Sequence, residues 1–485
     1  MRVALSIRRV PGEVPRILVE GRYPRVPGGW TAQLPVWRPG RYELQRYGRL
    51  FYRLEGRFPD GTWQLLPKSD LHTWPIPEAV TDLRWTFYAG ILDAGSTWVG
   101  EDLVYVNPVN CILYAPDHPH WAFDLELPDL PPDWTVATAL PTSPTSPASP
   151  VSPAARPRWS ARDADQLFDS PIVASPNLRH ASFDVAGTTF HLWAYRAPSV
   201  DWDRLLADHI RFTTTQVALF GGTFPEPVYH YLYLLPDLPV RHGVEHADST
   251  VIVLGPDELT GSEEGYAHLI DVGSHELYHA WNVKRIRPTD WMPYDFSQPQ
   301  TSRMGYIAEG VTTYMGDLML LEAGVIDEAG WCRRMETLLT RHLENPGRLQ
   351  LSVADSGFDT WLDGYTPGIP GRKGSIYVEG AVLAFLCDVR ILTRSQGKAS
   401  LQTAMHALWK SHGEPRIGLT ETDYWTALDA AAGTPGALAD LRTRFCDGTD
   451  DTWEDLVAAF HTQGFQLSHQ QHVVQIRRNQ SPSLS

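Results

Sequence analysis

The chain has 485 residues, of which 57 are acidic and 41 are basic, giving a formal net charge of −16. Its length predicts more than one domain, and a hydrophobic content of 43 % excludes wholesale disorder. The acidic balance argues against binding to nucleic acid or to an anionic membrane.

The N-terminal sequence MRVALSIRRVPGEV lacks the apolar segment of a signal peptide. No apolar run in the chain reaches the length of about 18 residues expected of a transmembrane helix. Four cysteines occur without any CxxC pair, which is weakly typical of a reducing compartment and excludes zinc-ribbon and redox motifs. We therefore expect a cytoplasmic protein.

Residues 1–140 contain short alternating runs such as RILVEGRY and RLFYRLEGRF, broken by Pro and Gly. This pattern predicts an antiparallel β-sandwich or saddle. Residues 141–158 are rich in Pro and Ser, a composition that predicts a linker or an exposed loop. Residues 182–235 return to strands, with an amphipathic helix near Trp202–Phe220.

From about residue 261, apolar residues recur at the three- to four-residue spacing of an α-helix. Ser262 followed by Glu263 and Glu264 is a helix start, because a capping hydroxyl and first-turn acids stabilise the free N–H groups. Further helices are expected over Gly305–Gly324, Glu328–Leu343, Tyr377–Arg394, Leu401–His412 and 420–464. The fold class is therefore a multidomain α+β chain, with strands first and helices after them.

The pattern His275-Glu276-Leu277-Tyr278-His279 is an HExxH motif on one of these helices. Residues four apart share a helical face, so His275 and His279 can bind one metal ion, while Glu276 can reach a water beside it. The alternative is a surface helix with two unrelated histidines. A catalytic zinc site needs a third protein ligand, and Glu309, 30 positions past His279, is our candidate. Glu309 could instead be an acid that stabilises its own helix dipole.

HELYHAWNVKRIRP at 275–288 resembles the signature of the glycyl aminopeptidase family of gluzincin metallopeptidases, and Glu309-Gly310 resembles that family's later EG pair. LPVWRPG at 34–40, the GVEH segment at 243–246 and SVADSGFDTW at 352–361 also resemble family segments. The resemblance extends from about residue 30 to 465. It implies one zinc ion per chain, held by His275, His279 and Glu309.

The resemblance also implies a domain plan. We expect an N-terminal β domain over 1–175, which includes the Pro/Ser-rich stretch as an inserted loop, and a thermolysin-like peptidase domain over 176–395. A helical region over 396–470 and a polar tail over 471–485 follow. We expect the chain to lack the C-terminal PDZ domain of many members. Glu379 stands where the family has lysine.

The implied reaction is release of a small N-terminal residue, Gly or Ala, from peptides with a free N-terminus. Glu276 would be the general base, Tyr377 would donate a hydrogen bond to the oxyanion, and Glu245 would bind the substrate ammonium. The charged run Lys284–Arg287 would brace the zinc helix. His242 and His246, which flank Glu245, are expected to be ordinary polar edge residues rather than a second metal site.

Two other interpretations stay open. The chain could be a zinc endopeptidase or another gluzincin hydrolase, such as an epoxide-hydrolysing relative. It could also be a non-catalytic binding scaffold on a peptidase fold, although the presence of His275, His279, Glu309 and Glu276 argues against that. The sequence does not indicate an oligomeric state.

Overall fold

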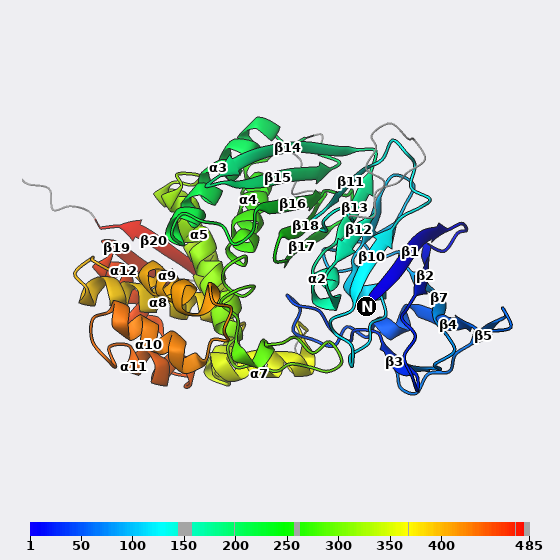
Figure 1. The fold of residues 1–485 in the computed structure, drawn as a ribbon. Helices are drawn as coiled ribbons and strands as arrows, with labels where there is room; N and C mark the ends of the chain where they lie inside the picture. Colours follow the sequence, from blue (N-terminus) through cyan, green and yellow to red (C-terminus); the bar gives the residue numbers. More distant parts are fainter. Residues whose placement is uncertain (144–157, 198, 257–261, 367, 471, 480–485) are drawn as a thin grey trace, which may run out of the picture.

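The computed structural model describes residues 1–143, 158–197, 199–256, 262–366, 368–470 and 472–479 (Figure 1). N-terminal strands lie at one end of the molecule and C-terminal helices at the other. A five-stranded sheet and the helices that cover it lie between them. This is a mixed α+β architecture with a β-rich N-terminal region, as the sequence predicts.

The N-terminal region is built on a seven-stranded sheet. Its strand order is β12 (Trp159–Ala161), β10 (Ala122–Glu126), β1 (Arg2–Val10), β2 (Arg16–Arg22), β7 (Asp82–Tyr88), β4 (Phe51–Arg57) and β5 (Trp63–Leu65). Val3, Leu5 and Ile7 alternate with exposed neighbours along β1, so one face of the sheet is buried. The period-2 pattern of the sequence therefore corresponds to a half-buried sheet.

Smaller elements complete this region. They are a second sheet of β11 (Thr135–Thr138), β13 (Ile172–Ser175), β9 (Val104–Val106) and β8 (Trp98–Val99), a pair of β3 (Trp30–Gln33) and β6 (Thr73–Ile76), and the short helices α1 (Pro108–Cys111) and α2 (Ala164–Phe168). Of the Pro/Ser-rich stretch, residues 144–157 lie outside the described residues. The strands that flank it, β11 and β12, both belong to the N-terminal sheets.

The central sheet has five strands. Their order is β14 (Leu178–Val185), β15 (Thr188–Tyr195), β16 (Val228–Leu234), β18 (Ser249–Gly255) and β17 (Val240–Glu245), so β17 is an edge strand. Helices α3 (Trp202–Leu219) and α4 (Glu263–Tyr278) pack on one face, against Tyr229, Tyr231 and Ile252. Val244 and Val251 on the other face pack against the N-terminal region.

The remaining helices enclose the other side of α4. They are α5 (Thr312–Glu322), α6 (Glu328–Glu344), α7 (Val353–Asp363), α8 (Val378–Arg394), α9 (Leu401–Leu408), α10 (Glu421–Ala431), α11 (Ala439–Leu441) and α12 (Trp453–Thr462). Three π-helical turns, η4 (Tyr306–Val311), η6 (Trp409–Gly413) and η7 (Arg442–Cys446), join or extend them. The helix expected over Gly305–Gly324 thus begins as a π-helix.

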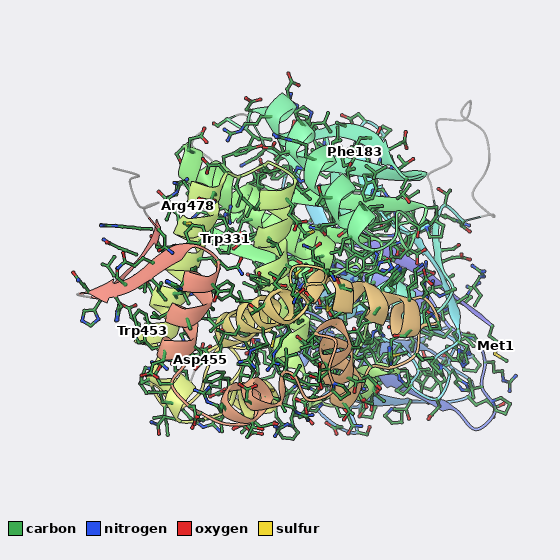
Figure 2. All side chains as sticks on the ribbon, turned by 90° about the vertical axis from the view of Figure 1, so that its left-hand side faces the viewer. Met1, Phe183, Trp331, Trp453, Asp455 and Arg478 are labelled. Carbon is green, nitrogen blue, oxygen red and sulfur yellow. The ribbon has the colours of Figure 1, made fainter. Side chains whose placement is uncertain are left out.

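The expectation of a polar tail from residue 471 is wrong for residues 473–478. These residues form β20 (Val473–Arg478), which pairs with β19 (Phe465–Gln470), so the expected C-terminal helical region also ends in a strand. Val474 and Ile476 are buried, and Ile476 donates its N–H to Glu336 on α6. Figure 2 labels Arg478 of this hairpin, which bonds Glu328 at the start of α6.

No helix in the described part of the chain is long and apolar enough to cross a membrane.

Candidate active site

Helix α4 carries the HExxH motif and begins as the sequence predicts. Ser262 accepts a hydrogen bond from Gly265 N–H, and Glu263 and Glu264 occupy the first turn. The helix ends at Tyr278, and His279 is its C-cap. His275 and His279 therefore project from the last turn of α4, where two imidazoles on one face can meet.

The imidazoles of α4 meet a carboxylate from η4. His275 Nε2 and His279 Nε2 are 3.1 Å apart, and Glu309 Oε2 lies 3.6 Å from the former and 3.3 Å from the latter. Ligand atoms around a tetrahedral zinc ion are about 3.3 Å apart. The three side chains therefore fit a zinc site, in both donor chemistry and spacing.

The tautomer of His279 suits metal binding. Its Nδ1 is 2.8 Å from the carbonyl oxygen of Asn282, which can only accept, so Nδ1 carries a proton and Nε2, which faces Glu309, is the atom that can bind a metal ion once its own proton is displaced. The Glu309 carboxylate raises the pKa of His279 to about 10, outweighing the opposing effect of burial. The same histidines hold the pKa of Glu309 well below its usual range, against the effect of burial.

A tyrosine from the N-terminal region contacts Glu309. The buried Tyr42 hydroxyl donates a 2.7 Å hydrogen bond to Glu309 Oε1, leaving Oε2 to face the histidines. Tyr42 packs face to face on Trp291 at 5.0 Å between ring centroids. Sequence reasoning missed Tyr42, although it lies only two residues after the LPVWRPG segment that carries part of the family resemblance.

Glycines bring α8 close to the π-helical turn. A Cβ on Gly310 would lie 2.3 Å from the Cα of Gly380, so these two backbones touch only because both residues are glycine. Tyr377, at the start of α8, is thereby held over His275, with 6.4 Å between the ring centroids. Its hydroxyl is 3.5 Å from that of Tyr365, a second tyrosine that the sequence did not reveal.

Glu276 and Glu245 face each other beside His279. One ligand atom of each of the three residues lies within 4.8 Å of the others. Glu276 Oε2 and Glu245 Oε1 are buried without a hydrogen-bond partner among the described residues. Burial, together with the Glu245 and Glu309 carboxylates, raises the pKa of Glu276 well above its ordinary value, although His279 opposes the shift. Unpartnered buried oxygens of this kind are available to a substrate.

Glycines of the edge strand β17 and of the N-terminal region lie against the carboxylates of Glu276 and Glu245. A Cβ on Gly243 of β17 would lie 2.2 Å from Glu276 Oε1, and a Cβ on Gly40 would lie 2.3 Å from Glu245 Oε2. His242 contacts Arg38 and Asp93, and His246 contacts Asp169. The structure therefore places both flanking histidines away from the HExxH cluster, as polar edge residues.

The charged run after the motif is buried rather than solvated. Lys284 donates to Asp169 at 2.8 Å, and Arg285 bonds Glu226 at 2.7 Å. Asn282 donates to the carbonyl of Ile307 in η4. These contacts tie the end of α4 to the elements around it, in keeping with the bracing role expected of them.

Glu379, which stands in the place of the family lysine, lies in the first turn of α8. It is buried, its Oε1 is 3.7 Å from His342 Nδ1, and it accepts the N–H of Ser375.

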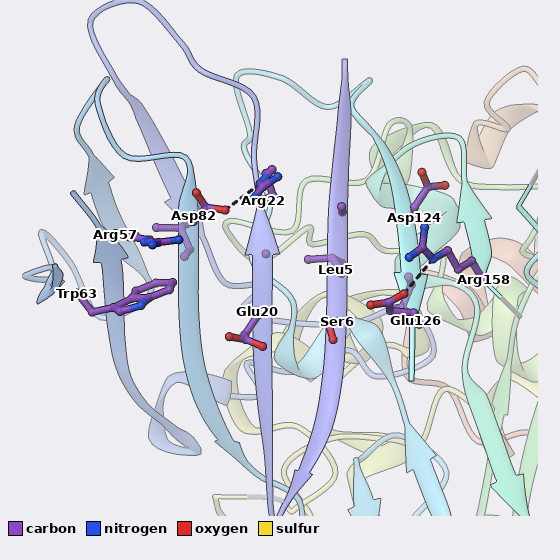
Figure 3. Close-up of a pocket in the computed structure, with 14 residues that line it drawn as sticks. Leu5, Ser6, Glu20, Arg22, Arg57, Trp63, Asp82, Asp124, Glu126 and Arg158 are labelled. Carbon is purple, nitrogen blue, oxygen red and sulfur yellow. Dashed lines mark hydrogen bonds and ion pairs between the residues drawn. The ribbon is translucent and has the colours of Figure 1, made fainter. Parts of the chain in front are cut away.

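A separate hollow of about 380 Å³ lies on the outer face of the seven-stranded sheet (Figure 3). Its charged side chains form ion pairs across neighbouring strands, with Arg22 2.9 Å from Asp82 and Arg158 2.9 Å from Glu126. The charges of these side chains are neutralised by each other, whereas carboxylate oxygens of Glu276 and Glu245 beside His279 have no partner among the described residues.

Comparison with known families gives two matches. Residues 268–383 match the family model described as M61 glycyl aminopeptidase, and residues 16–176 match that of the peptidase M61 N-terminal domain. The two matches include the segments that supply His275, His279, Glu309, Tyr377 and Tyr42. No curated protein matches the chain significantly.

Solved structures show the same fold. A crystal structure of an aminopeptidase N family protein from Idiomarina loihiensis has a TM-score of 0.87 and 22 % identity, over 96 % of this chain and 79 % of that one. An M1 zinc metallopeptidase from Deinococcus radiodurans has a TM-score of 0.54 and 15 % identity, over 93 % of this chain and 94 % of that one. The chain therefore shares the overall fold of these solved structures.

Proposed function

Because the chain belongs to the M61 glycyl aminopeptidase family, we propose that it is a zinc-dependent aminopeptidase that releases small N-terminal residues, Gly or Ala, from peptides. Its membership of this family supports a peptidase activity. The zinc ion, the preference for Gly or Ala and the roles of the individual residues are our proposal. The observation that carries the proposal is the convergence of His275, His279 and Glu309 at 3.1–3.6 Å. We propose one zinc ion per chain at this point.

A zinc ion so bound would supply Lewis acidity and lower the pKa of water. We assign the general base to Glu276, whose buried Oε2 lacks a partner in the described structure and can accept the water proton. The same carboxyl can then pass that proton to the leaving amine. Tyr377, beside His275, is our donor to the oxyanion that forms at the scissile carbonyl.

Glu245 is our ligand for the substrate ammonium. A carboxylate with an unpartnered buried oxygen attracts a cation strongly, and Glu245 Oε1 is such an oxygen within reach of Glu276. Gly40 lies directly against the other oxygen. We infer that this close backbone would hinder a residue preceding the amine, which favours removal of single N-terminal residues over internal cleavage.

The proposal is tested with a panel of aminoacyl reporters. Wild-type protein should hydrolyse the glycyl and alanyl reporters fastest, and Glu276→Gln should retain zinc but lose about 10²–10⁴-fold in turnover. Equal activity in both proteins would refute the role of Glu276. Cleavage of N-acetylated peptides at the rate of free-amine peptides would favour an endopeptidase. Failure to retain stoichiometric zinc would favour the non-catalytic scaffold.

The substrates that we propose are peptides with a free N-terminus. The cytoplasmic location expected from the sequence stays a prediction.

A further inference from the structure

A large cavity begins one helical turn away from the candidate zinc ligands. It encloses about 1120 Å³ between α4, α5 and α6. It reaches α4 at Asp271, one turn before His275, and α5 at Thr313, one turn after Glu309. This volume of about 1120 Å³ slightly exceeds the roughly 300–1,000 Å³ of small-molecule pockets, so several peptide residues would fit.

The edge strand indicates which part of a peptide would enter the cavity. Arg241, Gly243 and Glu245 alternate along β17 on the face toward α4: Gly243 abuts Glu276, and Arg241 Nη2 is 3.5 Å from Asp271 Oδ2. A peptide that pairs antiparallel with this edge, with its ammonium at Glu245, runs toward Arg241. Arg241 lines the cavity, so the residues after the scissile bond lead into it.

The acidic side chains of the cavity are largely engaged by its own groups. Arg334 lies 2.6 Å from Asp271 and 3.0 Å from Asp317. Burial and the neighbouring Asp271 carboxylate raise the pKa of Asp317 well above its ordinary value, although Arg334 opposes the shift. Of the other acids, Glu263 pairs with Arg204, Asp327 caps α6, and Glu264 in the first turn of α4 has no cation within 4.0 Å among the described residues.

Two guanidinium groups of the cavity are not engaged. Arg333 and Arg341 lie on one exposed stripe of α6, eight residues apart, and line the cavity. Within the ranges that the structure describes, neither has a carboxylate within 4.0 Å, whereas the neighbouring Arg334 has two. The cavity thus offers free positive charge where the end of a short peptide would lie.

We propose that this cavity binds the part of the substrate that follows the scissile bond, and that Arg333 and Arg341 select peptides carrying a carboxylate there. The carboxylate is either the free C-terminus of a short peptide or an acidic side chain; both present the same planar acceptor to a guanidinium. This inference rests on the proposed aminopeptidase function for the direction of the peptide.

The test uses the zinc-loaded Glu276→Gln protein, which would not consume its ligands, and calorimetric binding of matched peptides. One pair is Gly-Ala-Ala as free acid and as amide. The other pair is Gly-Ala-Glu-amide and Gly-Ala-Gln-amide. We expect the acidic member of at least one pair to bind about tenfold or more tightly, and the pair that shows the preference identifies the source of the carboxylate.

Variants separate the cavity from a general charge effect. Adding Arg333→Gln and Arg341→Gln should bring the two members of the pair near parity. A matched double variant of Arg394 and Lys398 to Gln, which removes equal charge from exposed positions outside the cavity, should leave the preference intact. Equal affinity within both pairs, absence of peptide binding, or equal loss in both double variants would overturn the inference.

A glycyl reporter that carries no carboxylate measures the proposed function separately, with wild-type protein. Reporter turnover without a carboxylate preference would overturn this inference alone. A carboxylate preference without reporter turnover would instead remove the proposed function and leave the cavity as an anion-binding site.

Discussion

The Tyr42 hydroxyl donates a 2.7 Å hydrogen bond to Glu309 Oε1 across 267 positions of sequence. It is a buried contact between the N-terminal β region and a candidate zinc ligand. By occupying one carboxylate oxygen, the tyrosine leaves the other directed at His275 and His279. Groups that orient metal ligands in this way contribute to metal affinity.

Removing this hydroxyl should weaken zinc binding. Tyr42→Phe keeps the ring that stacks on Trp291, so the loss is confined to one hydrogen bond. We expect a fall in zinc affinity or activity of about 10–100-fold, measured by competition with a chelator. Tyr23→Phe is the matched control, since Tyr23 donates a buried bond to Leu113 in the N-terminal core. Zinc affinity unchanged by Tyr42→Phe would contradict the role of Tyr42.

Separating η4 from α8 should affect both stability and turnover. A methyl group in Gly310→Ala would meet Gly380 Cα at 2.3 Å, so the helices must move apart and carry Tyr377 away from His275. We expect a loss of about 1–3 kcal/mol in unfolding free energy and a lower kcat. Gly368→Ala is the control, because a Cβ there meets nothing within 4 Å. Wild-type kcat in Gly310→Ala would argue against Tyr377 as a donor.

The amine-binding role of Glu245 predicts a selective defect. Glu245→Gln removes the charge but keeps the size, so we expect KM for a glycyl reporter to rise about 10- to 100-fold. Any slow cleavage of N-acetylated peptide should be unaffected, because that substrate has no ammonium to bind. Glu13→Gln, at an exposed position between β1 and β2, serves as the control. Equal KM changes for both substrates would show that Glu245 has only a structural role.

The buried ion pair after the HExxH motif should be costly to break. The Lys284 side chain is 1 % exposed and bonds Asp169 at 2.8 Å. Lys284→Met leaves that carboxylate in the interior without its cation, and we expect unfolding free energy to fall by about 3–5 kcal/mol in urea titrations. Arg25→Gln, which breaks the exposed pair with Glu78, should cost less than about 1 kcal/mol. Similar costs for both would contradict this assignment.

Stability should fall at acid pH partly through His209. Its imidazole is buried between Leu205 O and the Tyr233 hydroxyl, and burial lowers its pKa from 6.5 to about 4. The unfolded chain therefore takes up this proton first. The imidazole's contribution, about 3 kcal/mol, is present above pH 6.5 and is lost as pH falls toward 4.

Urea unfolding at pH 7.5 and pH 4.5 measures this loss. In His209→Gln the decrease between the two pH values should be smaller than in wild type, and in the exposed control His461→Gln it should match wild type. An identical decrease in His209→Gln would assign the acid sensitivity to other groups. His230, whose pKa burial lowers to about 3, would then be the next histidine to change.

Part of the candidate active site could be predicted because the residues that form it are close in sequence. Two imidazoles on one helical turn are a property of spacing alone, and the capped start of α4 is encoded within four residues. The expected helices also occur, within a few residues of the expected bounds. Local patterns therefore determined most of the secondary structure and the pair of histidines.

What could not be predicted depends on contacts between distant segments. Nothing near Tyr42 or Tyr365 in sequence indicates that their hydroxyls reach Glu309 and Tyr377. The strand β20 was missed for a different reason. The sequence VVQIRR does alternate, but the residues around it are polar, so it was interpreted as part of a polar tail. In the structure, Val474 and Ile476 of this strand are buried. The role of Gly310 likewise requires knowing that Gly380 faces it.

The bond from Tyr42 to Glu309 also has a consequence for biosynthesis. Tyr42 leaves the ribosome early, whereas Glu309 emerges only after most of the chain has been translated, so the N-terminal strands can fold while the metal site is still incomplete. We would then expect zinc to bind with full affinity only after the N-terminal strands have docked onto the segment that carries Glu309. A nascent fragment that ends after the HExxH helix lacks Glu309, so we expect it to hold a zinc ion more weakly than the full chain.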